Sequence, residues 1–166
     1  MKNIITRNLI IREFNIDDTS AYYKNNQDAQ IKKYMPNHTH ADEIEAREEL
    51  EECIAGYANM QMPLHFAIVK EDKLIGHIGI GESEIVERAY ELCCAVSKDY
   101  RGYNYAAEAV RAFAPWCKIA FGVDKIYASA NCDNVAPCKT LLNAGFILCE
   151  DKFKNEQEDM NVYVFI

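Results

Sequence analysis

The sequence is poor in the residues that break regular structure, since it holds only four prolines and seven glycines among 166 residues. Its hydrophobic share is ordinary, at 49%. Chains that stay disordered combine low hydrophobicity with abundant Pro, Gly or charge, so this composition argues against a disordered protein. The length suits one folding unit with a core of its own. We therefore predict a single domain spanning residues 1–166.

The paired cysteine motifs of zinc-ribbon and disulfide-rich proteins are also missing. Seven cysteines are present, an odd number, and no Cys-x-x-Cys pair occurs. Most of them lie within apolar runs, where a free thiol behaves as a small hydrophobic side chain. A reducing compartment suits such a chain, and we predict a cytoplasmic protein with reduced cysteines and no metal ion.

Histidine is scarce as well, with four residues in the chain. His38 and His40 could begin a metal site, but their spacing supplies no third ligand, and the segment is more typical of a helix entry. His77 lies in a predicted strand, where it either faces a substrate groove or, more simply, packs on the sheet. The sequence thus favours structural roles for these side chains.

Basic charge is in deficit, because 18 Lys and Arg oppose 26 Asp and Glu, for a net charge of -8. A nucleic-acid-binding protein would carry a basic patch, so we predict no nucleic-acid partner. The acidity either attracts a cationic partner or, more simply, keeps the protein in solution. No window approaches the roughly 18 apolar residues of a membrane span, and the N-terminus lacks the apolar region of a signal peptide. We predict no membrane association.

The apolar patterning predicts a mixed α/β domain around one sheet. Thr39 is the expected cap of the second helix, Pro115 is expected to kink or shorten the third, and Gly145 to stop the fourth. A turn at 71–73 joins two strands as a hairpin, and a polar loop is expected over 154–159. Strands are expected over 8–14, 65–69, 74–81, 89–96, 125–130, 146–153 and 160–166, and helices over 17–28, 39–57, 106–121 and 135–144.

The most informative stretch is 96–109, where a buried strand ends, a short loop follows and a helix opens at once. Backbone N–H groups at a helix start point outward and, with the helix dipole, bind anions such as phosphates. Gly102 lets a ligand approach the backbone, and Arg101 adds charged donors. This pattern indicates a diphosphate site, although a plain strand-to-helix turn would show the same pattern.

A second stretch, 133–146, contains a short amphipathic helix that Asp133 or Asn134 would cap and Gly145 would end. Capping alone accounts for this segment. The segment indicates a function only in combination with the first stretch. Asn134 follows Arg101 of that stretch by 33 positions.

Together the two stretches resemble the GNAT superfamily of acyl-CoA-dependent N-acyltransferases, whose members carry Arg/Gln-x-x-Gly-x-Gly/Ala after a strand and Asn-x-x-Ser…Gly-Phe further on. The segments 9–12 and 34–36, the acidic second helix and Glu91-Leu92 resemble the ribosomal-protein N-terminal (alanine) acetyltransferase-like branch. The resemblance covers nearly the whole chain. It implies an α/β fold with a central, mostly antiparallel sheet of six or seven strands, splayed between strands 4 and 5 and flanked by about four helices.

The resemblance also implies a site for acetyl-CoA as cosubstrate. Pantetheine would pair with the backbone at the end of the fourth strand, the diphosphate would lie on the loop amides, and two residues of the last helix region would contact the cofactor. The residues so implied are Cys94, Ala95 and Val96 for pantetheine, Arg101, Gly102, Tyr103, Asn104, Tyr105 and Ala106 for the diphosphate, and Asn134 and Lys139 beyond them. No metal is implied.

Four departures from the family pattern bear on this site. Asn104 stands where the family usually has Gly, and Asn is the residue that best tolerates a positive φ after Gly, so the loop is expected to survive. Pro137 stands where a Ser is frequent, and Cys93 and Cys94 replace a frequent Gly-Tyr. Leu141 occupies the place of a Tyr that protonates the departing thiolate in relatives, so water, Tyr103 or Tyr105 would have to serve.

Glu91 is the candidate general base, because it is an ionisable residue in an otherwise apolar strand near the expected acyl group. A glutamate in a salt bridge or at a sheet edge is the plainer alternative, and Glu13 and Glu82 are weaker candidates. Adjacent Cys93 and Cys94 should face opposite sides of the strand and not pair.

We predict transfer of an acetyl group to a primary amine, either a protein N-terminus or a small amine. A catalytically idle acyl-CoA-binding module is the alternative. A homodimer through the C-terminal strands or a free sheet edge is left open.

Overall fold

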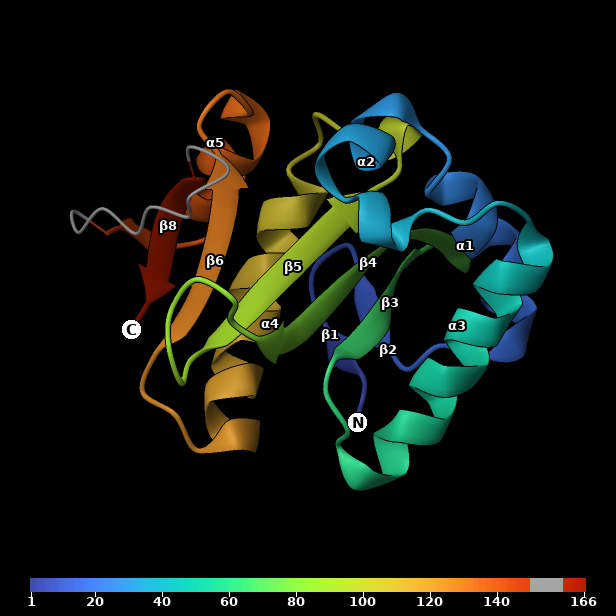
Figure 1. Ribbon diagram of the computed structural model, residues 1–166, viewed down its shortest axis with the longest axis horizontal. Coiled ribbons are helices and arrows are strands. Elements are labelled where there is room, and N and C mark those ends of the chain that lie inside the picture. The colour runs from blue at the N-terminus through green and yellow to red at the C-terminus, as the bar shows by residue number, and fades with distance from the viewer. Residues whose placement is uncertain (150–159) are drawn as a thin grey trace.

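A computed structural model describes residues 1–149 and 160–166. Eight strands form one mixed sheet in the order β1-β2-β3-β4-β5-β6-β8-β7 (Figure 1). Every neighbouring pair is antiparallel except β5 and β6, which are parallel. The strands are β1 (Ile4–Ile5), β2 (Ile10–Arg12), β3 (Leu64–Lys70), β4 (Lys73–Glu82), β5 (Tyr90–Val96), β6 (Ile126–Asn131), β7 (Ile147–Leu148) and β8 (Met160–Phe165).

The predicted mixed sheet is confirmed, with one addition. Ile4–Ile5 forms a short eighth strand, because Ile4 pairs with Ile11 and Ile5 with Ile10. The predicted polar loop at 154–159 and the second half of the strand predicted over 146–153, residues 150–153, lie outside the described residues.

Helices cover both faces of the sheet. The 17-residue α4 crosses behind it in Figure 1, while α2 and α3 lie toward the viewer. The α-helices are α1 (Thr19–Asn25), α2 (Ala29–Tyr34), α3 (Glu43–Gly56), α4 (Tyr105–Phe121) and α5 (Val135–Asn143), and the short 3-10 turns are η1 (Ile16–Asp18), η2 (Pro36–His38), η3 (Tyr57–Asn59) and η4 (Lys98–Tyr100). None of the helices in the described part of the chain has both the length and the hydropathy that a membrane span requires.

Two helix boundaries differ from the predictions, both for reasons of capping. The helix predicted over 17–28 ends at Asn25, because Asp28 caps a separate helix by accepting hydrogen bonds from the N–H groups of Gln30 and Ile31 at 2.8 and 3.1 Å. Thr39 does not cap α3, since its hydroxyl donates to Pro36 O at 2.7 Å within η2.

Asp42 is the N-cap residue of α3, and its carboxylate accepts from the N–H groups of Ile44 and Glu45 at 2.8 and 3.0 Å. Pro115 does not shorten α4, which continues to Phe121. Gly145 adopts φ 96° just after α5, as predicted for a helix stop.

The core consists of two apolar layers, one on each side of the sheet. Behind the sheet, α4 places Val110, Phe113 and Cys117 on one side at helical spacing, and all three are buried. Phe113 and Trp116 pack their rings on Phe66 of β3, each with a centroid separation of 5.5 Å. On the other face, a smaller layer joins α1 and α3 to β3 through Phe14, Tyr22, Ala46, Leu50, Ala67 and Val69. Both faces of the central strands are therefore covered.

Strands β3 and β4 form the predicted hairpin. Glu71 and Asp72 both have positive φ, 48° and 61°, as in the two-residue turns that match the twist of paired strands. The register of the hairpin sets Ala67 opposite His77 and His65 opposite Gly79.

The sheet opens between β5 and β6. These strands form a parallel pair only at Glu91 and Tyr127, and toward their C-terminal ends they diverge (Figure 1). This is the splay predicted between the fourth and fifth strands of the family fold.

Candidate active site

The end of β5 has a free backbone edge where β6 turns away. Ser97 donates its N–H to Ile75 O at 2.8 Å and Ser83 donates to Ala89 O at 2.8 Å. Hydrogen-bonded pairs alternate along an antiparallel ladder, so Cys93 and Ala95 bond to β4 while the peptide groups of Cys94 and Val96 face the open side. Among the three residues predicted to pair with pantetheine, Cys94 and Val96 therefore direct backbone groups to the open side, although Val96 O already accepts a hydrogen bond from Arg101, whereas Ala95 bonds to His77.

A tight loop follows this edge and leads into α4. Gly102 and Asn104 both adopt the left-handed conformation, with φ 84° and 65°. The prediction that Asn104 takes a positive φ in place of a glycine is confirmed. Asn104 is the residue before the first turn of α4, which begins at Tyr105. The two left-handed residues let the chain reverse so that the helix opens directly beside β5.

The loop has the properties of an anion site. Gly102, Tyr103 and Asn104 are exposed, and a Cβ at Gly102 would meet nothing within 4 Å. The first N–H groups of an α-helix have no acceptor within the helix and carry partial positive charge, so a phosphate fits there. The rings of Tyr103 and Tyr105 stack at 5.7 Å beside these groups. Residues 102–106 thus present a backbone surface suited to a diphosphate.

Arg101 holds the loop in place rather than standing free. Its Nε donates to Val96 O at 2.9 Å, its Nη1 donates to Gln30 Oε1 at 3.1 Å, and its Nη2 pairs with Asp28. Burial alone would raise the pKa of Asp28, but the Ile31 N–H and the guanidinium outweigh it and hold that pKa below its ordinary value. No local pattern pointed to these partners, which lie 71 and 73 positions from Arg101.

Asn134 and Lys139 lie on the far side of the splay, with α5. Asn134 occupies the position before α5 and donates its N–H to Asn131 O at 2.9 Å, but its side chain makes no capping bond. Lys139 is exposed. The predicted cofactor residues therefore form two groups, one on β5 and the loop before α4, the other at the start of α5.

Glu91 lies where β5 and β6 still touch, and two hydroxyl groups hold its carboxylate. Ser83 donates to Glu91 Oε2 at 2.7 Å, and Ser129 of β6 donates to Glu91 Oε1. The weaker candidates lie elsewhere, since Glu82 is exposed at the end of β4 and Glu13 pairs with the N-terminal amine beyond β2. The sequence identified Glu91 but not the serines that orient it.

The candidate proton donors differ in their surroundings. Leu141 is buried in the core behind the sheet, with 6% exposure, so its position offers no donor. Tyr103 is 67% exposed and Tyr105 is partly buried at the start of α4. Cys93 and Cys94 are both free thiols, as predicted, and burial raises the pKa of each.

A mixed sheet splayed beside a helix that begins in an exposed amide loop defines an acyl-CoA N-acyltransferase fold. The sequence model of the family described as "Acetyltransferase (GNAT) domain" matches residues 8–147. The chain therefore belongs to the GNAT family and is an acetyltransferase, as its motifs predicted.

Three relatives illustrate the likeness. The uncharacterized N-acetyltransferase YnaD of Bacillus subtilis (strain 168) is 27% identical over 143 residues, which cover 86% of this chain and 81% of YnaD. The structure of RimL, a ribosomal L7/L12 α-N-protein acetyltransferase in complex with coenzyme A, matches with a TM-score of 0.80 at 14% identity, covering 99% of this chain and 98% of RimL. The ribosomal-protein-S5-alanine acetyltransferase of Vibrio fischeri matches with a TM-score of 0.78 at 18% identity, covering 100% and 97%. The two structures share the fold of this chain.

Proposed function

We propose that this enzyme transfers the acetyl group of acetyl-CoA to a primary amine, with a peptide N-terminal α-amine as the first acceptor to test. The observation that carries the proposal is the free edge of β5, which ends directly at the exposed amide loop before α4. An extended amide chain attached to a diphosphate is complementary to that pair of surfaces, because one offers strand-type hydrogen bonds and the other binds anions.

In this proposal the backbone does most of the cofactor binding. Cys94 and Val96 pair with the amides of pantetheine, and the N–H groups of residues 102–106 hold the diphosphate. Asn134 and Lys139 contact the cofactor from the side of α5. Arg101 positions the loop through Val96 and Asp28 rather than by binding phosphate with its side chain. A chain of net charge -8 can thus bind an anionic cofactor locally through oriented amides.

The chemical step is direct transfer. The amine nitrogen attacks the thioester carbonyl carbon, the new C–N bond forms and the C–S bond breaks, and the proton lost by the amine balances the proton gained by the leaving thiolate. Glu91 removes the amine proton, directly or through water, with its carboxylate fixed by Ser83 and Ser129. Backbone N–H groups at the end of β5 polarise the carbonyl.

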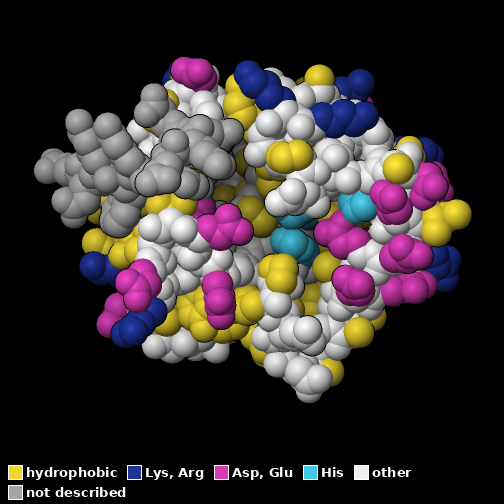
Figure 2. Space-filling view, in the orientation of Figure 1, with side chains coloured by type: hydrophobic (Ala, Val, Ile, Leu, Met, Phe, Trp, Pro, Cys, Tyr) yellow, Lys and Arg dark blue, Asp and Glu magenta, His cyan; other side chains and the backbone are white. Residues whose placement is uncertain are grey.

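The acceptor side of the site is the face that carries α2 and α3. Acidic side chains gather around the centre and right of this face (Figure 2). Negative charge there favours approach of a cationic amine. The ribosomal-protein N-terminal acetyltransferases among the structural neighbours support a peptide α-amine as the first class to examine.

A thiol-release assay with acetyl-CoA tests the proposal against a panel of N-terminal peptides and small amines. We expect CoA release that depends on an acceptor, with the acetyl group found on the amine by mass spectrometry. Tight CoA binding without turnover on any acceptor would instead indicate an idle CoA-binding module. Failure to bind CoA would overturn the proposed site itself.

Two glycines provide a matched pair of variants for the cofactor site. Gly102 and Gly122 lie at opposite ends of α4, both have positive φ, and a Cβ added to either would meet nothing within 4 Å. Gly102→Asp places a negative charge among the amides and should weaken CoA binding about ten-fold or more, a loss of about 1.4 kcal/mol. Gly122→Asp should leave CoA binding unchanged. Equal effects of the two variants would contradict the assigned diphosphate site.

A further inference from the structure

All four histidines of the chain meet on the face of the sheet opposite α4. His65 of β3 and His77 of β4 lie on adjacent strands, and His38 of η2 lies over them, with ring centroids 5.0 Å from His65 and 4.8 Å from His77. His40 packs against Tyr22 nearby and pairs with Glu49. Residues far apart in the sequence thus share one small region, although no histidine has a role in the proposed transfer.

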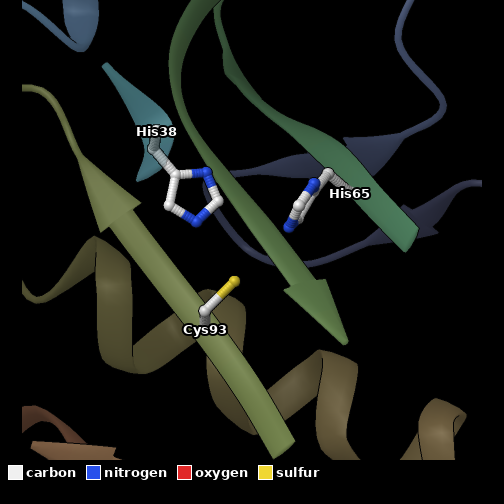
Figure 3. A group of neighbouring side chains, drawn as sticks. All are labelled: His38, His65 and Cys93. Atoms are coloured by element: carbon white, nitrogen blue, oxygen red, sulfur yellow. The ribbon is translucent and has the colours of Figure 1, made fainter. Parts of the chain in front are cut away.

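Cys93 of β5 faces the same region. Gly79 is opposite both His65 and Cys93 in the sheet, so these two residues flank it on either side. A Cβ at Gly79 would lie 2.1 Å from His65 Cδ2, which means that the imidazole occupies the space that a side chain would fill. One ligand atom each of His38, His65 and Cys93 lies within 4.8 Å of the other two, and Figure 3 shows the three side chains converging from η2, β3 and β5.

Three of the imidazoles in this region, those of His38, His40 and His77, carry a buried nitrogen atom without a hydrogen-bond partner among the described residues. His77 is 1% exposed. Neither its Nε2 nor the Nδ1 of His38 makes a hydrogen bond among the described residues. A buried polar atom left unpaired costs free energy, and native structures pair such atoms with protein, water or an ion. An ion bound within the cluster would give such nitrogens a partner.

The protonation states suit a cation. Burial lowers the pKa of His65 to about 4 and also lowers the pKa values of His38 and His77, so all three rings are neutral near pH 7 and have lone pairs to donate. Burial raises the pKa of Cys93 to about 12, so the thiol keeps its proton until a metal displaces it. Two imidazoles and a thiolate form a donor set typical of Zn²⁺.

We propose that His38, His65 and Cys93 bind one Zn²⁺ ion per chain, with His77, whose ring centroid lies 4.8 Å from that of His38, as a candidate for the fourth position. Binding forms a Zn–S bond at Cys93 and releases the thiol proton to solvent. The spacing of His38 and His40 in the sequence does not indicate this cluster, because His65 and Cys93 come from strands further along the chain. Histidine side chains are visible near the middle of the face in Figure 2.

A second set of potential ligands, Glu49, Cys53 and His65, shares His65 with the first. It is the weaker candidate, because Glu49 already pairs with His40 and accepts a hydrogen bond from Tyr22 at 3.1 Å. The first set, in contrast, includes His38, whose Nδ1 has no hydrogen bond among the described residues. Cys53 therefore serves as the matched cysteine for distinguishing the two sites.

A metal ion at this site would also link η2 to the sheet. His38 ends η2, the turn between α2 and α3 on the proposed acceptor face, while His65 and Cys93 belong to the sheet. A metal ion joining them would tie that turn to β3 and β5. This role is independent of acetyl transfer, so metal binding can be tested without substrate.

The test is titration of the tag-free, chelator-treated protein with Co²⁺, a spectroscopic substitute for Zn²⁺. We expect saturation at one ion per chain, a near-ultraviolet band from thiolate-to-cobalt charge transfer, and its loss when Zn²⁺ displaces Co²⁺. Cys93→Ser should remove the band, while Cys53→Ser and the exposed Cys132→Ser should retain it. His38→Ala should weaken binding by about a hundred-fold or more.

Circular dichroism and CoA binding verify that each variant is folded. In addition, Zn²⁺ should raise the Tm of the parent protein but not that of Cys93→Ser. No thiolate band in the parent protein would overturn the proposal. A band that survives in Cys93→Ser and disappears in Cys53→Ser would assign the metal to the other set. If Cys93→Ser does not fold, His38→Ala decides the question, because unaltered Co²⁺ affinity in that variant excludes the site.

Discussion

The carboxylate of Glu91 on β5 accepts a hydrogen bond from the hydroxyl of Ser129 on β6, at the last point where the two strands pair. Ser83 holds the other carboxylate oxygen at 2.7 Å. The proposed base is thus anchored at the closed end of the splay, with the free edge of β5 beginning immediately beyond it. These two hydrogen bonds fix the orientation of the Glu91 carboxylate. In the proposed mechanism this carboxylate accepts the proton of the incoming amine.

Replacing Glu91 by Gln should lower kcat about ten-fold or more, on the scale of a lost general base, while the Kd for CoA changes little. The amide preserves the shape of the side chain and can still accept from Ser129, so folding should be retained. Steady-state kinetics and CoA titration measure the two effects. Glu87→Gln, a change at an exposed side chain that pairs with Arg88, is the control. Turnover like that of the parent enzyme would remove Glu91 from the mechanism.

The left-handed backbone of Asn104 predicts a simple order among its variants. Asn104→Gly should fold and bind CoA, since Gly adopts positive φ freely. Asn104→Val should reduce the free energy of unfolding by about 1–2 kcal/mol, because a β-branched residue resists that conformation, and should weaken CoA binding. Denaturant unfolding and CoA titration give both quantities.

Met60→Val is the matched control for this loop, because Met60 also has a positive φ, 51°, but lies after η3. It should show the loss of stability without the loss of CoA affinity. Weakened CoA binding in Met60→Val would indicate that general destabilisation, rather than loop shape, controls the cofactor site.

The ion pair of Asp28 with Arg101 predicts a pH dependence of stability. The pKa of Asp28 is lowered in the folded state, so its ionised form stabilises the fold above the unfolded pKa, and this contribution is lost as pH falls through the folded pKa. Asp28→Asn keeps an N-cap side chain but removes the charge. The parent protein should exceed the variant in stability at neutral pH, and the difference should vanish in acid.

Urea unfolding at a series of pH values from neutrality into the acid range measures this difference. Asp17→Asn, an exposed residue near α1, provides a control for the general effect of removing one negative charge. A difference between parent protein and Asp28→Asn that stays constant into acid would contradict the role of the ionised carboxylate.

Thiol labelling should separate Cys132 from the cysteines of β5. Cys132 is exposed, whereas burial raises the pKa of Cys94 and of Cys93. The thiolate is the reactive form, so an alkylating reagent should modify Cys132 first and the β5 pair only after unfolding. Peptide mapping by mass spectrometry identifies the order. Early modification of Cys94 in the folded protein would show that β5 is open on its α4 side.

The fold was largely predictable because its signals are local. The hairpin of β3 and β4, the left-handed conformation at Asn104 and the helix stop at Gly145 each depend on a few neighbouring residues. The incorrect predictions concern helix starts, which also depend on short segments. Asp28 and Asp42 cap helices where the pattern suggested a continuous helix and a Thr39 cap, because several polar side chains compete for the same N–H groups and only the folded chain selects one.

The sequence by itself determined the family, the strand that carries Glu91 and the loop suited to a diphosphate, since each motif lies within a short contiguous segment. Only the tertiary structure decided which distant side chains meet: Asp28 with Arg101, Ser129 with Glu91, and His38 with His65 and Cys93. For His65 and Cys93 the physical reason is strand register. Pairing of β3, β4 and β5 aligns residues tens of positions apart on one face of the sheet, and no local pattern in the chain records that alignment.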